Sequence, residues 1–327
     1  MKFSDDLLRF DERAVFALRE LYRQFGYSQY RMNRFEEYEL YAENKAFLDS
    51  GDIITFTARS GKLMALRPDV TLSIVKNAKD SHELQKLCYN ENVYRPMGPG
   101  LDFKERMQIG LECLGALDAQ SIGEVVMLAR RSLDVLSAGA PAQPQIERNE
   151  KKSCLDISHT GYIQGLLQST GLPGTQKTEI LRRVSEKNVH ELGALCVEFG
   201  VDAKLREKIT ALTTLYGPIG ETLPQLRELS VNEETDTAVR ELAELNDVLK
   251  TLDADDCVNI DFSVRGDMRY YCGVVFQGYI EGVPAKVLSG GRYDKLLQKF
   301  GKKSGAIGFA VYLDLLERLD EKEGRAQ

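Results

Sequence analysis

The sequence predicts an α+β fold, in which long antiparallel strands are flanked by helices and interrupted by a helical segment. Two short apolar runs joined by a tight turn indicate a hairpin, and two further runs separated by a wide loop indicate a second strand pair. Residues 161–252 then show almost only helical periodicity before strand-like runs return. No glycine-rich phosphate loop opens a helix after a strand, so a Rossmann or P-loop fold has no support.

The N-terminal part begins with a helix and a hairpin. Helical periodicity covers residues 4–25, and Gly26 is suited to end the helix. The runs 52–58 and 62–68 are strand-like, and the turn between them ends in Gly61, which predicts a hairpin.

The next elements continue the alternation of helix and strand. We expect a short helix over residues 69–79 and a longer one over 121–136. Between them, strand-like runs at 93–95 and 106–115 flank a Gly/Pro-rich loop at 96–100.

The second half of the sequence predicts a helical insertion between two parts of a core that contains the sheet. After the helical residues, the expected elements are strands at 257–264, 270–280 and 285–290, a helix at 293–300, and a strand-helix pair at 306–319. We therefore predict the first part of the core over residues 1–160, a helical insertion over 161–253, and the second part of the core over 254–327.

Composition narrows the class of protein. The 327 residues are 43% hydrophobic and carry a net charge of -7, which argues against a protein that mainly holds a nucleic-acid backbone. The six cysteines form no C-x-x-C pair and there are three histidines, so no zinc spacing occurs. The first residues carry no apolar signal region, and no run is apolar and long enough to span a bilayer. We expect a cytoplasmic protein without a metal or cofactor.

Asp69 and Thr71 lie at a predicted strand-to-helix turn. Their oxygens could accept hydrogen bonds from an ammonium group. The alternative is that Asp69 only caps the helix that follows.

Gln108, Gly110 and Glu112 alternate with apolar residues along a predicted strand. A period of two places them on one face of the strand, where they could line a ligand site. A polar strand face turned to water fits the pattern equally well.

Tyr270 and Tyr271 precede a small residue and could close over a flat ring, although aromatic core packing also explains them. Gly290 and Gly291 precede Tyr293 and permit close approach of backbone to backbone or to a ligand. A plain strand-to-helix turn is the alternative there.

Taken together and in order, these segments resemble the histidyl-tRNA synthetases. The resemblance runs over nearly the whole chain, including the helical insertion, and implies a class II synthetase core that is usually dimeric. The segments that carry it are F-E-x-x-E-L-Y (35–41), L-R-P-D-x-T (66–71), Y-R…K-E-x-x-Q-x-G-x-E (94–112), Y-Y-x-G-x-V-F (270–276) and G-G-R-Y-D…A-I-G-F-A (290–310).

The resemblance also implies site residues. The positions that hold histidine in the synthetases carry polar and aromatic side chains here. The expected histidine-binding residues are Asp69, Thr71, Gln108, Glu112, Tyr270, Tyr271 and Tyr293. Arg95 matches the arginine that contacts the ATP α-phosphate and is expected to retain an anion contact.

Other ATP-binding positions depart from the synthetase pattern. Met97 stands in place of a glutamate, and Leu315 in place of the arginine that binds the γ-phosphate. An ungapped alignment puts Gly266 at the catalytic arginine, with Arg265 one residue early and hence on the opposite strand face. Adenylate chemistry depends on such positioned cations, so we expect no catalytic residue and no enzyme activity by the chain itself. The anticodon-binding domain of the family is also not expected.

One group within this resemblance fits a histidine pocket without ATP chemistry: the regulatory subunits of ATP phosphoribosyltransferase. The resemblance implies a short-form catalytic partner, a hetero-octamer of four plus four chains, self-association as a dimer, and L-histidine as effector. Membrane and tRNA binding are not expected. The alternatives are a synthetase-like ligase acting on a substrate other than tRNA, and a tRNA-binding accessory protein.

Overall fold

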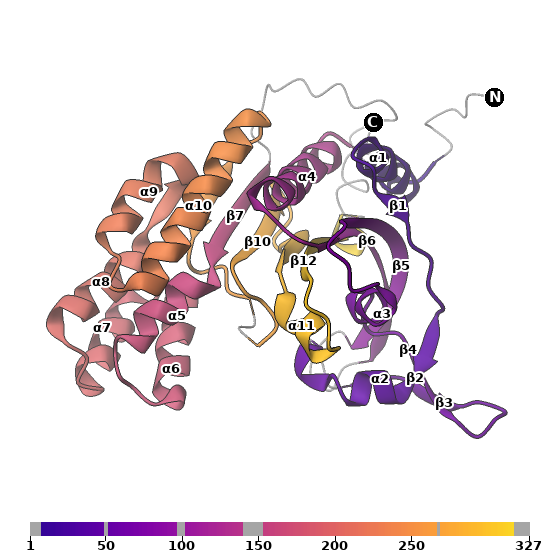
Figure 1. The fold of residues 1–327 in the computed structure, drawn as a ribbon, viewed down its shortest axis with the longest axis horizontal. Coiled ribbons are helices and arrows are strands. Elements are labelled where there is room, and N and C mark those ends of the chain that lie inside the picture. The colour runs from indigo at the N-terminus through magenta and orange to yellow at the C-terminus, as the bar shows by residue number, and fades with distance from the viewer. Residues whose placement is uncertain (1–7, 49–51, 97–101, 140–152, 267–268, 317–327) are drawn as a thin grey trace.

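The computed structural model describes residues 8–48, 52–96, 102–139, 153–266 and 269–316 (Figure 1). In this part of the chain, a nine-stranded sheet runs through the molecule. Its strands, in spatial order, are β1 (Ser28–Gln29), β5 (Gln85–Pro96), β6 (Phe103–Gly115), β12 (Gly305–Tyr312), β11 (Leu288–Arg292), β10 (Val274–Ile280), β7 (Ser153–His159), β9 (Val258–Asp261) and β8 (Tyr216–Pro218). A smaller sheet holds β2 (Phe35–Glu37), β4 (Leu63–Leu66) and β3 (Thr55–Thr57), in that order.

The large sheet is mixed rather than purely antiparallel. All pairs from β5 to β7 are antiparallel, but β1 pairs with β5 in parallel and β7 pairs with β9 in parallel. The expectation of an antiparallel sheet is therefore wrong at these two pairs. The physical reason at β9 is its connection: the chain leaves β7, crosses through the helical segment and returns beside it in the same direction.

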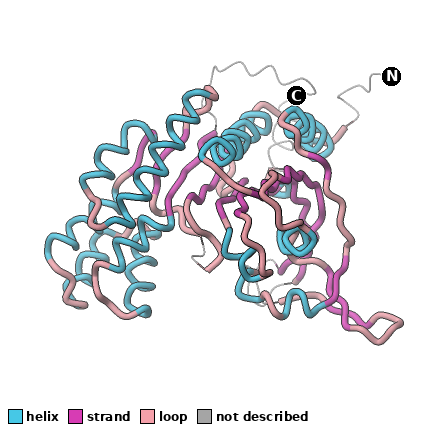
Figure 2. Tube along the Cα trace, in the orientation of Figure 1, coloured by secondary structure: helices cyan, strands magenta, loops and turns pink. Residues whose placement is uncertain are grey.

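Helices cover the sheet, and six of them form one group between β7 and β9. Figure 2 shows this group on the side of the molecule away from β5. The group consists of α5 (Thr160–Gln168), α6 (Gly174–Ser185), α7 (Val189–Glu198), α8 (Ala203–Thr214), α9 (Ile219–Glu228) and α10 (Glu233–Thr251). The remaining elements are α1 (Phe10–Gln24), α2 (Tyr38–Ala42), α3 (Thr71–Asn77), α4 (Ala119–Ser137), α11 (Asp294–Lys299) and the 3₁₀ turns η2 (Lys45–Phe47) and η3 (Leu313–Leu315).

Two clusters of buried apolar side chains hold these layers together. The larger cluster joins α1, α4 and the sheet to the helical group, and α10 packs along α4. The smaller cluster joins α2, α3 and α11 to β5 and β6. None of the described helices combines the length and apolarity needed to cross a membrane.

Most predicted elements are confirmed with shifted ends. The hairpin is β3–β4, and Gly61 has the positive φ of +82° that its turn requires. The two strands with a wide loop are β5 and β6, but β5 begins at Gln85 rather than at residue 93. β7 was not expected, because its polar residues resemble those of a loop rather than those of an interior strand. The division into residues 1–160, 161–253 and 254–327 stays a prediction.

Candidate functional site

The seven expected histidine-binding residues and Arg95 all line one cavity of about 360 Å³. This volume suits a small metabolite. β6 supplies Gln108 and Glu112, and the other residues come from the ends of neighbouring elements. Those ends carry Asp69, Thr71, Arg95, Tyr270, Tyr271 and Tyr293.

Glu112 lies at the centre of the polar end. Thr71 donates a hydrogen bond to its Oε1 at 2.8 Å, and the hydroxyl of Tyr293 donates to its Oε2 at 2.6 Å. Only 2% of Glu112 is exposed. Burial raises the pKa of this carboxyl to about 8, although the two hydroxyl donors act in the opposite direction. A positive charge bound beside this carboxyl would lower its pKa again and favour its ionised form.

Gly308 creates the space for this carboxyl. It lies opposite Glu112 in the pairing of β12 with β6, and a Cβ at Gly308 would stand 1.7 Å from Glu112 Oε2. Gly290 is equally constrained, because its Cβ would lie 2.3 Å from the carbonyl oxygen of Gly308. These glycines let three strands approach closely beneath the pocket, as the double glycine suggested.

Asp69 makes two contacts at the N-terminal end of α3. Its Oδ1 accepts a hydrogen bond from the backbone N–H of Leu72 at 2.8 Å, so the helix-capping interpretation holds. Its Oδ2 lies 3.1 Å from a guanidinium nitrogen of Arg95, which also donates through Nε to the carbonyl of Pro68 at 2.6 Å. Arg95 therefore already faces an anion of the chain itself, while both side chains line the cavity.

The three tyrosines form an aromatic wall. The rings of Tyr270 and Tyr293 stack at 5.5 Å, and Tyr271 meets Tyr270 edge-on at 4.5 Å. Burial raises the pKa of Tyr270 and of Tyr293 well above that of a free phenol, so both stay protonated. The tyrosines therefore pack against one another and also line the pocket.

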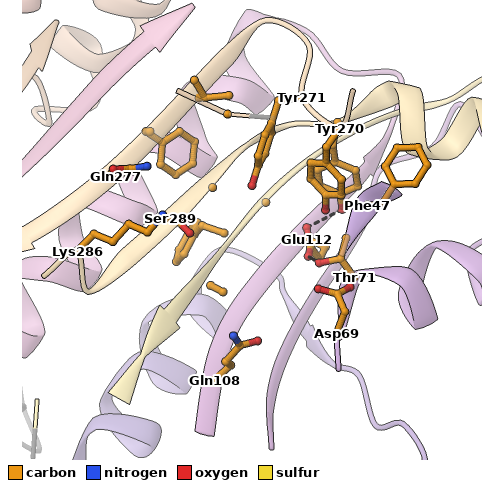
Figure 3. Close-up of a pocket in the computed structure, with 18 of the residues that line it drawn as sticks. Phe47, Asp69, Thr71, Gln108, Glu112, Tyr270, Tyr271, Gln277, Lys286 and Ser289 are labelled. Atoms are coloured by element: carbon orange, nitrogen blue, oxygen red, sulfur yellow. Dashed lines mark hydrogen bonds between the residues drawn. The ribbon is translucent and has the colours of Figure 1, made fainter. Parts of the chain in front are cut away.

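Figure 3 shows that the pocket has two ends. Asp69, Thr71 and Glu112 gather on one side, whereas Gln277, Lys286 and Ser289 lie on the other, with Tyr271 between them. Gln108 lies on the same strand as Glu112 and is 4% exposed.

The structure describes three of the four positions that depart from the synthetase ATP-binding pattern. A Cβ at Gly266 would meet the ring of Tyr271 at 2.4 Å, so a side chain at this position requires the ring to move. Arg265 is exposed at the rim of the pocket. Leu315 does not line the pocket but packs against the large core cluster. Met97 lies outside the described residues.

Several pocket residues were missed in the sequence. Gln277, Ser289 and Ala310 are consecutive partners across β10, β11 and β12, so period-two reasoning applied to all three strands could have found them. No sequence signal indicates Phe47, which comes from η2. Among the other missed residues are the polar side chains of Tyr89, Arg269, Lys286 and Tyr312.

The sequence matches the family model of histidyl-tRNA synthetases over residues 6–316. The ATP phosphoribosyltransferase regulatory subunit of a Geobacillus species is 31% identical and covers 92% of this chain and 75% of its own. The chain belongs to the regulatory subunits of ATP phosphoribosyltransferase within the histidyl-tRNA synthetase family. A second member, from Oceanobacillus iheyensis, is 27% identical over 96% of this chain and 75% of its own.

Solved structures support the fold of this family. A protein from Bacillus halodurans, described as an ATP phosphoribosyltransferase regulatory subunit/histidyl-tRNA synthetase, has a TM-score of 0.80 at 27% identity and covers 94% of this chain and 78% of its own. A histidyl-tRNA synthetase from Nostoc has a TM-score of 0.76 at 18% identity and covers 95% of this chain and 71% of its own. The predicted class II synthetase-like core is thus confirmed.

Proposed function

We propose that this chain is the non-catalytic subunit that an ATP phosphoribosyltransferase needs for activity and for feedback inhibition by L-histidine, in the first step of L-histidine biosynthesis. Family membership supports the regulatory role. The observation that carries the effector site is the convergence of all eight expected residues on one cavity. A cytoplasmic setting belongs to the same proposal.

The chemistry of the pocket suits histidine. The amino acid carries an ammonium group and imidazole N–H groups, which need acceptors, and Asp69, Gln108 and Glu112 supply them. Thr71 adds a hydroxyl group, and the tyrosine rings provide a flat wall for the imidazole. Arg95 faces the same cavity and could receive the carboxylate of the ligand.

The partner is, in this proposal, a short-form catalytic subunit, assembled as a hetero-octamer of four plus four chains. A complex described as ATP phosphoribosyl transferase (HisG:HisZ) from Thermotoga maritima contains a chain of the same fold, with a TM-score of 0.68 at 21% identity and coverage of 95% of this chain and 98% of its own. Exposed Phe35, Phe56 and Leu63 on the small sheet support self-association as a dimer.

Histidine would then act by differential binding. If the ligand binds one arrangement of the complex more tightly than another, it shifts the population toward that arrangement. The effect is reciprocal, so the state of the catalytic subunit also changes the affinity for histidine.

The direct test mixes this chain with a short-form catalytic subunit and measures phosphoribosyl transfer from phosphoribosyl pyrophosphate to ATP. We expect transfer only in the mixture, and its inhibition by added L-histidine. A mixture no more active than the catalytic subunit alone contradicts the regulatory role.

Pocket variants test where histidine is sensed. Asp69→Ala and Glu112→Ala each remove an acceptor for a charged ligand, so we expect at least about tenfold weaker inhibition with assembly intact. Glu105→Ala, an exposed acid on the same strand as Glu112, is the matched control and should behave as the wild type. Unchanged inhibition in both pocket variants would place the sensor elsewhere.

The ligase alternative predicts a different result. ATP–pyrophosphate exchange driven by histidine requires an adenylate, and the positions of Gly266 and Leu315 offer no arginine for it. We expect no exchange above background. Clear exchange would favour the ligase over the regulatory subunit.

A further inference from the structure

The side chains that β12 turns toward the cavity increase in size along the strand. Gly308, Ala310 and Tyr312 are alternate residues of β12, so they face the same side of the sheet. All three line the cavity that contains Glu112. The row begins with a hydrogen atom, continues with a methyl group and ends with an aromatic ring. The cavity is therefore deepest over Gly308 and most filled at Tyr312.

Tyr312 stands at the end of this row that is farther from Glu112. Gly308 pairs with Glu112 across β12 and β6, whereas Tyr312 pairs with Gln108. Four residues along a strand span about 13 Å. The side chain of Tyr312 therefore begins well away from Glu112, at the Gln108 end of the cavity.

Two hydrogen bonds fix Tyr312 against β11. Its backbone N–H donates to the carbonyl of Val287 at 2.8 Å. Its hydroxyl lies 2.6 Å from Oγ of Ser289, and either oxygen can donate. Since Ser289 pairs with Ala310, the ring leans back across Ala310 and bridges β12 to β11. Tyr312 therefore closes the side of the cavity between Gln108 and Ser289.

A different part of the cavity carries the acceptors that histidine needs. Asp69, Thr71 and Glu112 gather there, and Ser289 lies on the other side (Figure 3). If the ammonium and imidazole groups of the ligand occupy the acid end, a group attached to its carboxyl carbon is left with the space between Gln108 and Ser289. The ring of Tyr312 already fills that space.

We propose that Tyr312 sets the largest ligand that this cavity accepts: a free amino acid fits, and an amino acid with a bulky group on its carboxyl carbon is excluded. This role rests on the proposed function, because it takes histidine as the ligand. An enlarged ligand enters only if the ring moves aside, which breaks the hydrogen bond to Ser289 and disturbs the close packing on the sheet. A side chain placed against an unwanted ligand in this way gives specificity.

The test compares L-histidine, L-histidine methyl ester and L-histidine β-naphthylamide by calorimetric titration of the full chain. Both derivatives lack the carboxylate charge, so the difference between them reports mainly the added bulk. Each derivative is measured by its displacement of bound L-histidine, which extends the range to weak ligands. We expect the wild type to bind the naphthylamide at least about tenfold more weakly than the methyl ester. Tyr312→Ala should reduce this ratio at least about tenfold, because it opens the closed side of the cavity.

Two further variants control for indirect effects. Tyr312→Phe keeps the ring and loses only the hydroxyl, so it should lose less of the discrimination than Tyr312→Ala does. Tyr216→Ala removes an exposed tyrosine of the same sheet outside the cavity and should leave the ratio unchanged. If Tyr312→Ala fails to fold in a thermal melt, Tyr312→Leu takes its place with the same expected change.

The outcomes separate the role of Tyr312 from the proposed function. A wild type that binds L-histidine, and binds the naphthylamide as tightly as the methyl ester, overturns the role of Tyr312 and leaves the histidine site intact. The same conclusion follows from an unchanged ratio in Tyr312→Ala, or from an equal fall in Tyr216→Ala. A wild type that does not bind L-histidine contradicts the histidine site itself and, with it, the role of Tyr312.

Discussion

Glu112 illustrates how far single residues can be read from the sequence. Its period-two relation to Gln108 predicted a shared polar face, and both residues line the cavity. The sequence could not show that the face is buried, because the side chain of Glu112 is covered by distant segments, among them Gly308 of the neighbouring strand β12 and Tyr293. Nor could it show the hydroxyl of Tyr293, which is distant along the chain. The identity of the acid was predictable, but its raised pKa depends on tertiary packing.

The raised pKa of Glu112 predicts a pH-dependent stability. The folded pKa of about 8 lies above the ordinary value of 4.5, so the folded state binds this proton more tightly than the unfolded state. The contribution of this carboxyl to the free energy of unfolding is therefore fully present below about pH 4.5 and is lost as the pH rises to about 8. At about 1.4 kcal/mol per pKa unit, we expect the wild type to lose a few kcal/mol more than Glu112→Gln over this range.

Urea unfolding at several pH values checks this expectation. The difference in unfolding free energy between wild type and Glu112→Gln should grow steadily in favour of the variant from pH 5 to pH 8. The variant Glu105→Gln, exposed on the same strand, should run parallel to the wild type. A difference that stays constant with pH would mean that Glu112 is already ionised in the folded protein.

At the scale of elements, the helices, the hairpin and most interior strands were predictable, whereas the interior strand β7 was not. α4 and the β3–β4 hairpin carry their signals locally, in periodicity and in Gly61. β7 contains Asp156, Ser158 and His159, which read as loop residues. They are buried because β7 lies between β10 and β9, so their partners come from distant segments. Because those partners are distant along the chain, the sequence around β7 shows no alternating pattern that would predict a strand.

Arg67 connects β4 to two other parts of the chain through hydrogen bonds. The L-R-P-D-x-T segment gave no indication of this structural role. Arg67 is 1% exposed. Its Nε donates to the carbonyl of Asn92 at 2.7 Å, one terminal nitrogen donates to the carbonyl of Asn33 at 3.0 Å, and the other lies 2.6 Å from Glu91 Oε2. The end of β4 is thereby fixed to β5 and to the segment before β2.

We expect Arg67→Met to destabilise the protein by roughly 3–5 kcal/mol, because it leaves Glu91 and two carbonyl groups without their donor. Chemical denaturation followed by circular dichroism measures the loss. Lys62→Met, which breaks the exposed pair of Lys62 with Glu37, should have little effect. A similar small effect for Arg67→Met would show that water replaces the guanidinium at this site.

At the scale of the whole molecule, the fold class was predictable, but the packing of the helical group against α4 and the sheet was not. The order of the motifs indicated the synthetase-like core and the helical insertion. It could not indicate that the inserted helices share one apolar cluster with α4 and the sheet. This sharing follows from the return of the chain to β9 beside β7, which sets α10 along α4.

Gly123 and Val248 test whether the helical group and the sheet domain truly share this core. Gly123 lies within α4, and a Cβ there would stand 2.3 Å from Cγ1 of Val248 on α10. In an unpacked helix, Gly→Ala stabilises by about 1 kcal/mol. In a packed one, the added methyl group is typically destabilising by about 1–3 kcal/mol. The sign of the change therefore reports on the packing.

We expect Gly123→Ala to lower the unfolding free energy in urea, and Val248→Ala to lower it modestly through lost contacts. The double variant should be more stable than the sum of the two single changes predicts, since the smaller side chain on α10 admits the new methyl group on α4. Such a positive coupling is the signature of direct contact in a double-mutant cycle. If Gly123→Ala instead stabilises the protein and the two changes simply add, α10 moves away from α4 in solution, and the helical group is a separately moving body.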